Sequence, residues 1–139
     1  MRVLFDTNVI LDLLLDRKPF SEHSAVIISE VEKGKITGVL SATTITTIYY
    51  LVAKYLSKKE ADRSMELIFS LFEIAPVNRT VLETAKRLNF NDFEDAVIYA
   101  SAIHSKVDSV ITRNIKDFKS KEIPVYEPAE FLKILKTCK

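Results

Sequence analysis

Three short segments of the chain carry acidic and amide side chains that could bind a divalent metal ion. Asp6 is the first, the segment N-D-F-E-D at 91–95 is the second, and R-N-I-K-D at 113–117 is the third. Hard cations such as Mg²⁺ take carboxylate and amide oxygens together with water. Such sites hydrolyse phosphodiester bonds by generating hydroxide and stabilising the leaving oxygen. No cluster of His or Cys with zinc spacing offers a competing chemistry.

Asp6 lies where a strand is expected to end and a helix to begin. The apolar run 3–5 predicts a buried strand, and residues 8–16 keep their apolar side chains at helical spacing. Open α/β sheets place reactive groups at the carboxyl ends of their strands. Asp is also a common N-cap, so Asp6 taken alone fits a structural role equally well.

The second segment opens a helix predicted over 91–104, which is apolar nearly all round and therefore expected to be buried. Asn91 as N-cap, with Glu94 three residues later, fits a capping box, and Asp92 suits a first turn. Capping does not explain Asp95, which takes the fourth helical position with no basic residue in the next two turns. A carboxylate on a buried helix needs a partner to offset desolvation, which indicates a functional role for Asp95.

Asn114 and Asp117 follow the fourth predicted strand and resemble an ordinary turn when taken alone. Three polar segments at the ends of strands or helices in one small domain are explained more economically by one common site than by three separate causes. A parallel sheet would bring all three to one edge.

The alternation of strands and helices predicts an α/β fold, with parallel strands joined by right-handed crossovers. The length of 139 residues and the absence of a composition break predict a single domain over 1–139. Pro76 confines the third strand to an edge or an end, and Gly34 is expected to stop the second helix. The expected strands are 3–5, 36–40, 74–77, 110–112 and 123–126, and the expected helices are 8–16, 21–33, 43–55, 58–72 (a hairpin with the preceding helix), 78–88, 91–104 and one opened by Pro128.

Composition narrows the choice of partners only slightly. A net charge of +1 makes no case by itself for nucleic acid or membrane binding. Cys138 is the only cysteine, and no apolar stretch reaches the roughly 18 residues of a membrane span. We expect a soluble, cytoplasmic protein with no membrane partner.

The segments V-L-F-D-T-N-V-I-L-D at 3–12, D-F-E-D-A at 92–96 and I-T-R-N-I-K-D-F at 111–118 strongly resemble PIN domains. The order and spacing of these motifs cover almost the whole chain. The resemblance implies a three-layer α/β/α fold around a central, mostly parallel five-stranded sheet. It also implies a metal-dependent ribonuclease, most similar to the VapC-type toxins of toxin–antitoxin pairs. These toxins are often dimers inhibited by a cognate antitoxin.

The same resemblance assigns roles to particular residues. Asp6 and Asp95 would bind Mg²⁺ or Mn²⁺, and Asn114 with Asp117 would complete the metal site. Asp6, Asp95 and Asp117 are thus the expected catalytic residues, in an endonuclease whose substrate is RNA. Apart from the resemblance, Thr7 or Asn8 is expected to assist by orienting a ligand or the attacking water.

One position departs from the family pattern. The family usually has a Glu six residues after the Ser that follows the second strand, and counting from Ser41 leads to Thr47. A missing carboxylate removes charge that would hold a divalent ion. The alternative is therefore a non-catalytic or weakly active PIN-like module that binds RNA or a protein.

Three other acids could replace the missing one if their side chains reach the site. Asp92 is three residues from Asp95 and shares its helix surface, whereas Glu94 is expected to point well away. We therefore rank Asp92 above Glu94 as a metal ligand, with Asp12 as a further candidate.

Basic residues after the fourth strand are candidates for substrate contact. Arg113 and Lys116 flank the expected metal site, and Lys119 and Lys121 extend the basic stretch. Such side chains would position RNA through its phosphates without reading its sequence. An ordinary solvated loop is an equally good interpretation.

Overall fold

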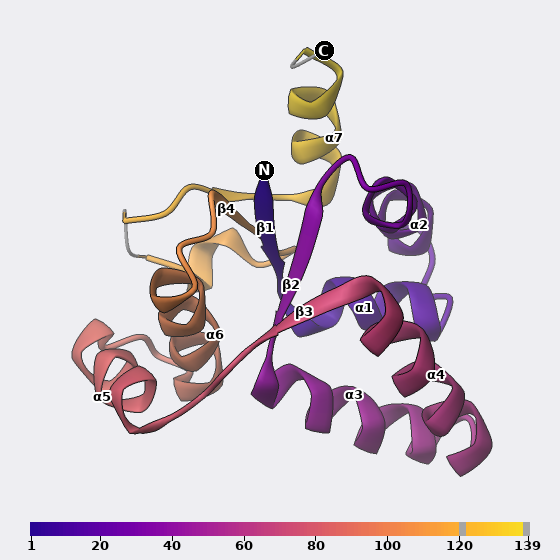
Figure 1. The fold of residues 1–139 in the computed structure, drawn as a ribbon, viewed down its shortest axis with the longest axis horizontal. Helices are drawn as coiled ribbons and strands as arrows, with labels where there is room; N and C mark the ends of the chain where they lie inside the picture. The colour runs from indigo at the N-terminus through magenta and orange to yellow at the C-terminus, as the bar shows by residue number, and fades with distance from the viewer. Residues whose placement is uncertain (120–121, 138–139) are drawn as a thin grey trace.

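The structure is a computed structural model that describes residues 1–119 and 122–137. A five-stranded sheet with strand order β3-β2-β1-β4-β5 lies between two layers of helices (Figure 1). All four strand pairings are parallel, which confirms the predicted fold class. The strands are β1 (Arg2–Phe5), β2 (Thr37–Ser41), β3 (Phe72–Ala75), β4 (Ser109–Ile111) and β5 (Val125–Tyr126). The helices are α1 (Thr7–Leu14), α2 (Phe20–Glu32), α3 (Ala42–Tyr55), α4 (Lys58–Leu71), α5 (Arg79–Leu88), α6 (Phe93–His104) and α7 (Pro128–Thr137), with a 3₁₀ turn, η1 (Ile115–Asp117).

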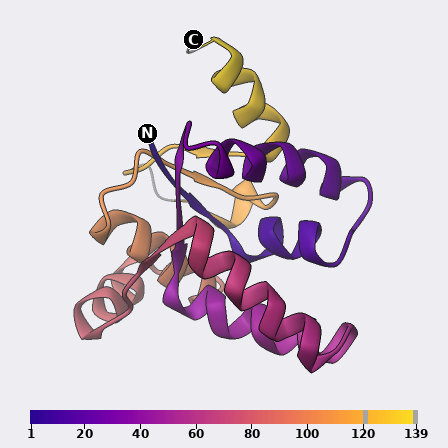
Figure 2. The ribbon, with the colours of Figure 1, turned by 45° about the vertical axis from the view of Figure 1, so that its right-hand side comes forward.

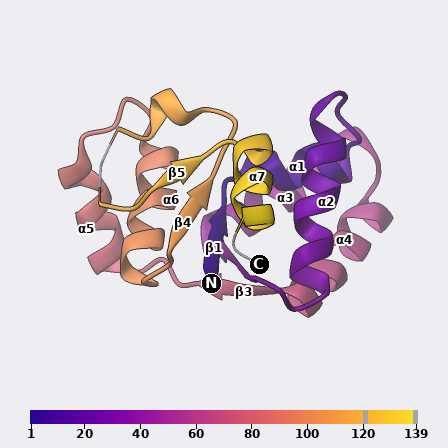
Figure 3. The same cartoon turned by 90° about the horizontal axis from the view of Figure 1, so that it is seen from above.

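The central strand β1 buries side chains on both faces of the sheet. Val3 and Phe5 join the core formed with α1, α2, α3, α4 and α7, whereas Leu4 joins the core that includes α6. This alternation follows from the two-residue period of a strand. Figure 3 shows the result, with α5 and α6 on one side of the sheet and α1 to α4 on the other. A strand covered on both faces is uniformly apolar, as the run 3–5 predicted.

The carboxyl ends of β1, β2 and β4 lie at the same edge of the sheet. Residues Leu4 and Val110 are paired across β1 and β4, and the backbone N–H of Asp6 extends the pairing to the carbonyl of Ile111 at 2.9 Å. At this edge α1 leaves β1 and α3 leaves β2, opposite the edge where the N-terminus and α7 lie (Figure 1). Short connections from adjacent strands therefore converge at one place.

The strands differ from their predicted bounds by one or two residues. β3 begins at Phe72, which was predicted to be helical, because Phe72 pairs with Gly38 of β2. Pro76 follows the end of β3 directly, and β3 is an edge strand as expected. A Cβ on Gly38 would lie 2.6 Å from the Phe72 ring, so this close approach requires glycine. β4 ends at Ile111, and β5 spans only Val125–Tyr126.

The helices largely follow their predicted ranges. Gly34 has φ +77° directly after the C-cap of α2, which confirms the predicted stop. The predicted hairpin is also present, since α3 and α4 pack side by side (Figure 2). None of the helices in 1–119 and 122–137 is long and apolar enough to cross a membrane. Lys121 and Cys138 lie outside the described residues.

Candidate active site

A small polar cavity of about 260 Å³ opens at the carboxyl edge of the sheet. It brings together residues from α1, α3, the start of α6 and the segment after β4. Six of the residues expected to bind metal or substrate line it, and so does Thr47, the position of the missing acid. The lining residues are Asp6, Thr7, Asn8, Leu11, Thr47, Leu51, Asp92, Glu94, Asp95, Asn114 and Asp117.

Asp6 is the buried, fixed member of this set, with 3% of its surface exposed. It is the N-cap of α1, and one carboxylate oxygen accepts from the backbone N–H of Thr7 at 2.7 Å. The other oxygen accepts from the hydroxyl of Thr112 at 2.7 Å. Burial raises the pKa of Asp6, against the lowering effect of these two hydrogen bonds. Asp6 is thus both a cap and a cavity residue, so the two interpretations of the sequence are compatible.

The start of α6 differs from the prediction. Asp92, and not Asn91, is the N-cap, and its carboxylate accepts from the backbone N–H of Asp95 at 3.1 Å. The helix therefore begins at Phe93, and Asp95 takes its third position instead of the fourth. Asp92 satisfies a backbone donor of the first turn and lines the cavity at the same time.

Glu94 is a cavity residue that the sequence interpretation ranked below Asp92 as a replacement ligand. It was expected to point away from Asp95, and this expectation is wrong, because Glu94 lines the same cavity. Its charge contributes to raising the pKa of both Asp6 and Asp95. Glu94 and Asp95 are consecutive residues of α6, and helical spacing predicts that such residues do not face each other, yet both line the one cavity.

The carboxylates repel one another. The pKa of Asp95 is raised to about 7, first by burial and then by the charges of Asp6, Asp92, Asp117 and Glu94, in that order. The pKa of Glu94 is also raised, by burial and by the charge of Asp92. Loss of a proton from this cluster is therefore unfavourable without a cation, and a bound cation would relieve the repulsion between the carboxylates.

The segment after β4 supplies the amide and the last acid. The hydroxyl of Thr112, which donates to Asp6, also accepts from the backbone N–H of Asn114 at 3.0 Å. Asp117 closes the turn η1, with its N–H bonded to the Asn114 carbonyl at 2.9 Å. Both side chains are exposed and line the cavity. Thr112 thereby couples the position of this segment to that of Asp6.

The expected phosphate contacts do not line the cavity. Arg113 instead forms two hydrogen bonds to Asp12, at 2.6 and 3.1 Å. Asp12 is fully buried, so it does not reach the cavity as a replacement ligand. Lys116 and Lys119 are exposed, as a solvated loop would have them.

The chemistry of the donor set fits a hard divalent cation. Its polar members are carboxylates, two amides and two hydroxyls, with no imidazole or thiolate among the lining residues. Among the described residues, however, no three such groups stand close enough together to hold an ion as they lie. The residues that would hold such an ion are Asp6, which is buried, Asp95, which is half-buried, and Asp117, which is exposed.

The chain is similar to proteins of known family over nearly its whole length. A family profile described as a PIN domain matches residues 2–116. Ribonuclease VapC1 of Aquifex aeolicus is 31% identical over 135 residues, which cover 94% of this chain and 92% of the relative. A toxin–antitoxin complex from Klebsiella pneumoniae contains a chain that is 26% identical, with a TM-score of 0.69 over 91% of this chain and 97% of that one.

A DNA-bound VapBC complex from Salmonella typhimurium shares the fold, with a TM-score of 0.70, 16% identity and coverage of 92% of this chain and 98% of that one. The strand order, the polar cavity at the carboxyl edge of the sheet and these matches all point to the same family. The chain belongs to the PIN-domain family.

Proposed function

We propose that this protein is a Mg²⁺- or Mn²⁺-dependent endoribonuclease that hydrolyses RNA phosphodiester bonds in the cytoplasm. One observation carries the proposal: acids from three segments far apart in the sequence line one polar cavity. These acids are Asp6 from the end of β1, Asp92 with Asp95 from the start of α6, and Asp117 from η1. The printed activity of the Aquifex relative, a ribonuclease, supports the substrate class.

The metal ligands of the cavity would be of two kinds, one held in a fixed position and the others adjustable. Asp6 is held by Thr7 and Thr112 and provides a fixed oxygen. Asp95 and Asp117 would close on the ion from two other elements. A bound Mg²⁺ or Mn²⁺ would lower the pKa of a water molecule and stabilise the leaving oxygen. Asn114 and Asn8 provide amide groups at the cavity wall that can orient water or a phosphate oxygen.

Glu94 is proposed as a further metal ligand in place of the acid absent at Thr47. Both side chains line the cavity, one from α6 and the other from α3. The charge lost on α3 is thus restored from α6. This supports catalysis over the non-catalytic alternative, for which the missing acid was the main argument.

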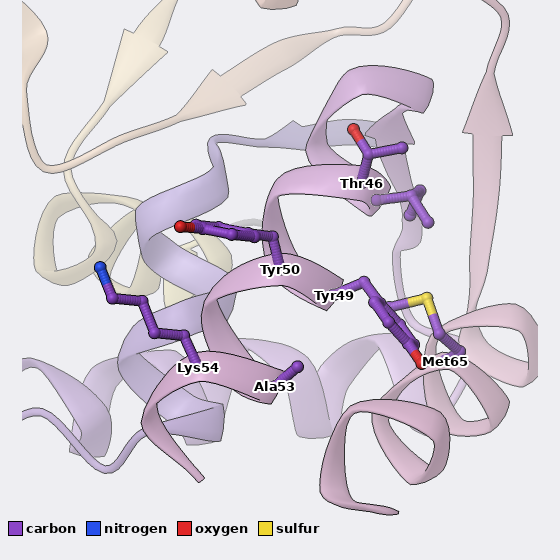
Figure 4. A pocket seen from close by; sticks show the side chains of 7 residues that line it. Thr46, Tyr49, Tyr50, Ala53, Lys54 and Met65 are labelled. Atoms are coloured by element: carbon purple, nitrogen blue, oxygen red, sulfur yellow. The ribbon is translucent and has the colours of Figure 1, made fainter. Parts of the chain in front are cut away.

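We further propose that the protein acts as a toxin, is inhibited by a cognate antitoxin and forms a homodimer. The structural neighbour from Klebsiella pneumoniae, described as a toxin–antitoxin complex, supports the first two points. An apolar groove of about 610 Å³ between α3 and α4 supports a protein interface (Figure 4). It includes Tyr49 and Met65, and Tyr50 on its rim is 63% exposed. Light scattering should give twice the mass of one chain, and a single-chain mass at every concentration would contradict the dimer.

An RNA cleavage assay with and without Mn²⁺ tests the nuclease proposal. Wild-type protein should cut only with the metal, and Asp6→Asn and Asp95→Asn should each reduce cleavage by about 100-fold or more, because each removes a charge from the site. Cleavage that survives chelation or both substitutions would show a contaminating nuclease. No cleavage and no Mn²⁺ binding in calorimetry would favour the binding module.

A further inference from the structure

Asp12 is a buried acid that the proposed chemistry does not use. Its side chain has no exposed surface, although it lies on α1 only six residues after Asp6. An isolated carboxylate in such a place would cost several kcal/mol, so it must be paired. The Nε and Nη2 atoms of Arg113 donate to its two oxygens, and the guanidinium of Arg17 lies 3.7 Å away.

The pairing joins residues that are 101 positions apart in the sequence. Arg113 is the residue directly before Asn114, so its position determines where the segment that carries Asn114 and Asp117 begins. The guanidinium also lies 4.0 Å from the centre of the Phe20 ring. Arg113 is thus held between an acid on α1 and an aromatic ring on α2.

The neighbouring residue is bound to α1 as well. Thr112 donates to Asp6 at the first turn of α1, while Arg113 is bound to Asp12 in the second turn. Two consecutive residues therefore attach the segment to two points of one helix, which fixes its direction as well as its position. At its far end the segment is anchored by Phe118, which is buried against Phe90 and Tyr99.

We propose that Asp12 is a positioning residue, which acts through Arg113 to place Asn114 and Asp117 opposite Asp6 in the metal site. Arg113 is accordingly a structural clamp, since both of its guanidinium donors toward α1 are engaged by Asp12. A bidentate pair of this kind fixes geometry in a way that a lysine cannot. The inference rests on the proposed metal site for its catalytic consequence, but the clamp itself can be tested without it.

The direct test is amide hydrogen exchange in the metal-free protein. Asp12→Asn and Arg113→Lys should each speed exchange at Asn114, Asp117 and Phe118 by roughly tenfold or more, because local opening of the segment becomes easier. Exchange in α4 should stay at the wild-type rate. The matched control is Ile68→Ala, which removes buried side-chain volume from α4, a helix that contributes nothing to the cavity.

Calorimetry with Mn²⁺ then measures the functional consequence. Asp12→Asn and Arg113→Lys should weaken Mn²⁺ binding about 10- to 100-fold, as expected for residues that orient metal ligands. Ile68→Ala should leave Mn²⁺ affinity unchanged even if its overall stability is lower. If Asp12→Asn does not fold, Arg113→Lys keeps the test, because it preserves the charge next to Asp12.

Three results would overturn the proposal. The first is unchanged exchange at 114–118 in both clamp variants, and the second is an equal rise throughout the molecule. The third is an equal loss of Mn²⁺ affinity in Ile68→Ala, which would show that affinity follows stability alone. A wild-type protein that binds no Mn²⁺ would refute the proposed metal site, while the exchange data would still decide on the clamp.

Discussion

Asp95 combines two conditions that oppose each other in the metal-free protein. It needs its negative charge to bind a cation, yet burial and four neighbouring acids raise its pKa to about 7. A carboxylate of this kind binds a proton until the metal displaces it. Asp6 is under the same opposing conditions, because burial raises its pKa while the hydroxyl of Thr112 and the backbone N–H of Thr7 lower it.

The pKa of Asp95 makes the stability of the metal-free protein depend on pH. Between the ordinary value of 3.8 and about 7, folded Asp95 holds a proton that the unfolded chain has lost. The free energy of unfolding should therefore fall as pH rises through this range and level off above it. Urea denaturation in EDTA at about pH 5, 6, 7 and 8 should show this fall in wild type and a smaller one in Asp95→Asn. Parallel pH profiles of the two proteins would contradict the assignment.

Sequence spacing located most of the cavity residues, but it misjudged the direction of Glu94 and the role of Arg113. Asp6, Asn114 and Asp117 were found because they follow strands, and parallel strands bring their carboxyl ends together. Glu94 was expected to point away from Asp95 because consecutive helical residues do not face each other, but both residues line the cavity at the start of α6. The role of Arg113 could not be inferred, because its partner Asp12 is distant in sequence and only the fold brings them together.

At the scale of elements, we propose that α6 supplies the acid that the family pattern would place on α3. If Glu94 replaces the acid absent at Thr47, Glu94→Gln should weaken Mn²⁺ binding about tenfold or more, and Thr47→Glu should restore it in that background. Calorimetry of Glu94→Gln, Thr47→Glu and the double variant measures the Mn²⁺ affinity of each protein. No recovery in the double variant would show that the two positions do not serve the same ion.

Asp92 can act in two ways at the first turn of α6, as the helix cap and as a negative charge at the cavity, and two variants distinguish them. Asp92→Ala removes both, so it should lower the free energy of unfolding by about 1 kcal/mol and weaken Mn²⁺ binding. Asp92→Ser keeps a side chain that can cap and removes only the charge, so its stability should stay near wild type while metal binding falls. Urea denaturation and calorimetry on both variants give the comparison. Full Mn²⁺ affinity in Asp92→Ser would leave Asp92 as a cap alone.

At the scale of the whole molecule, the fold was predictable because buried apolar strands alternate with helices along the chain. The apolar run 3–5 and the largely apolar run 36–40 predict strands buried on both faces, and the helices between them require parallel pairing. The errors lie at element ends. Phe72 has a side chain suited to the helix before it, but its pairing with Gly38 places it in β3.

The three segments of the cavity belong to different parts of the chain, so an ion that joins them should stabilise the entire fold. At a free Mn²⁺ concentration about 100 times its dissociation constant, linkage gives about 2.7 kcal/mol. For a chain of 139 residues this corresponds to a rise in Tm of roughly 8 °C over the protein in EDTA. Differential scanning calorimetry should show that rise in wild type and little of it in Asp6→Asn, whose neutral amide lacks the charge to hold the ion. An equal rise in both proteins would place the bound Mn²⁺ outside this cavity.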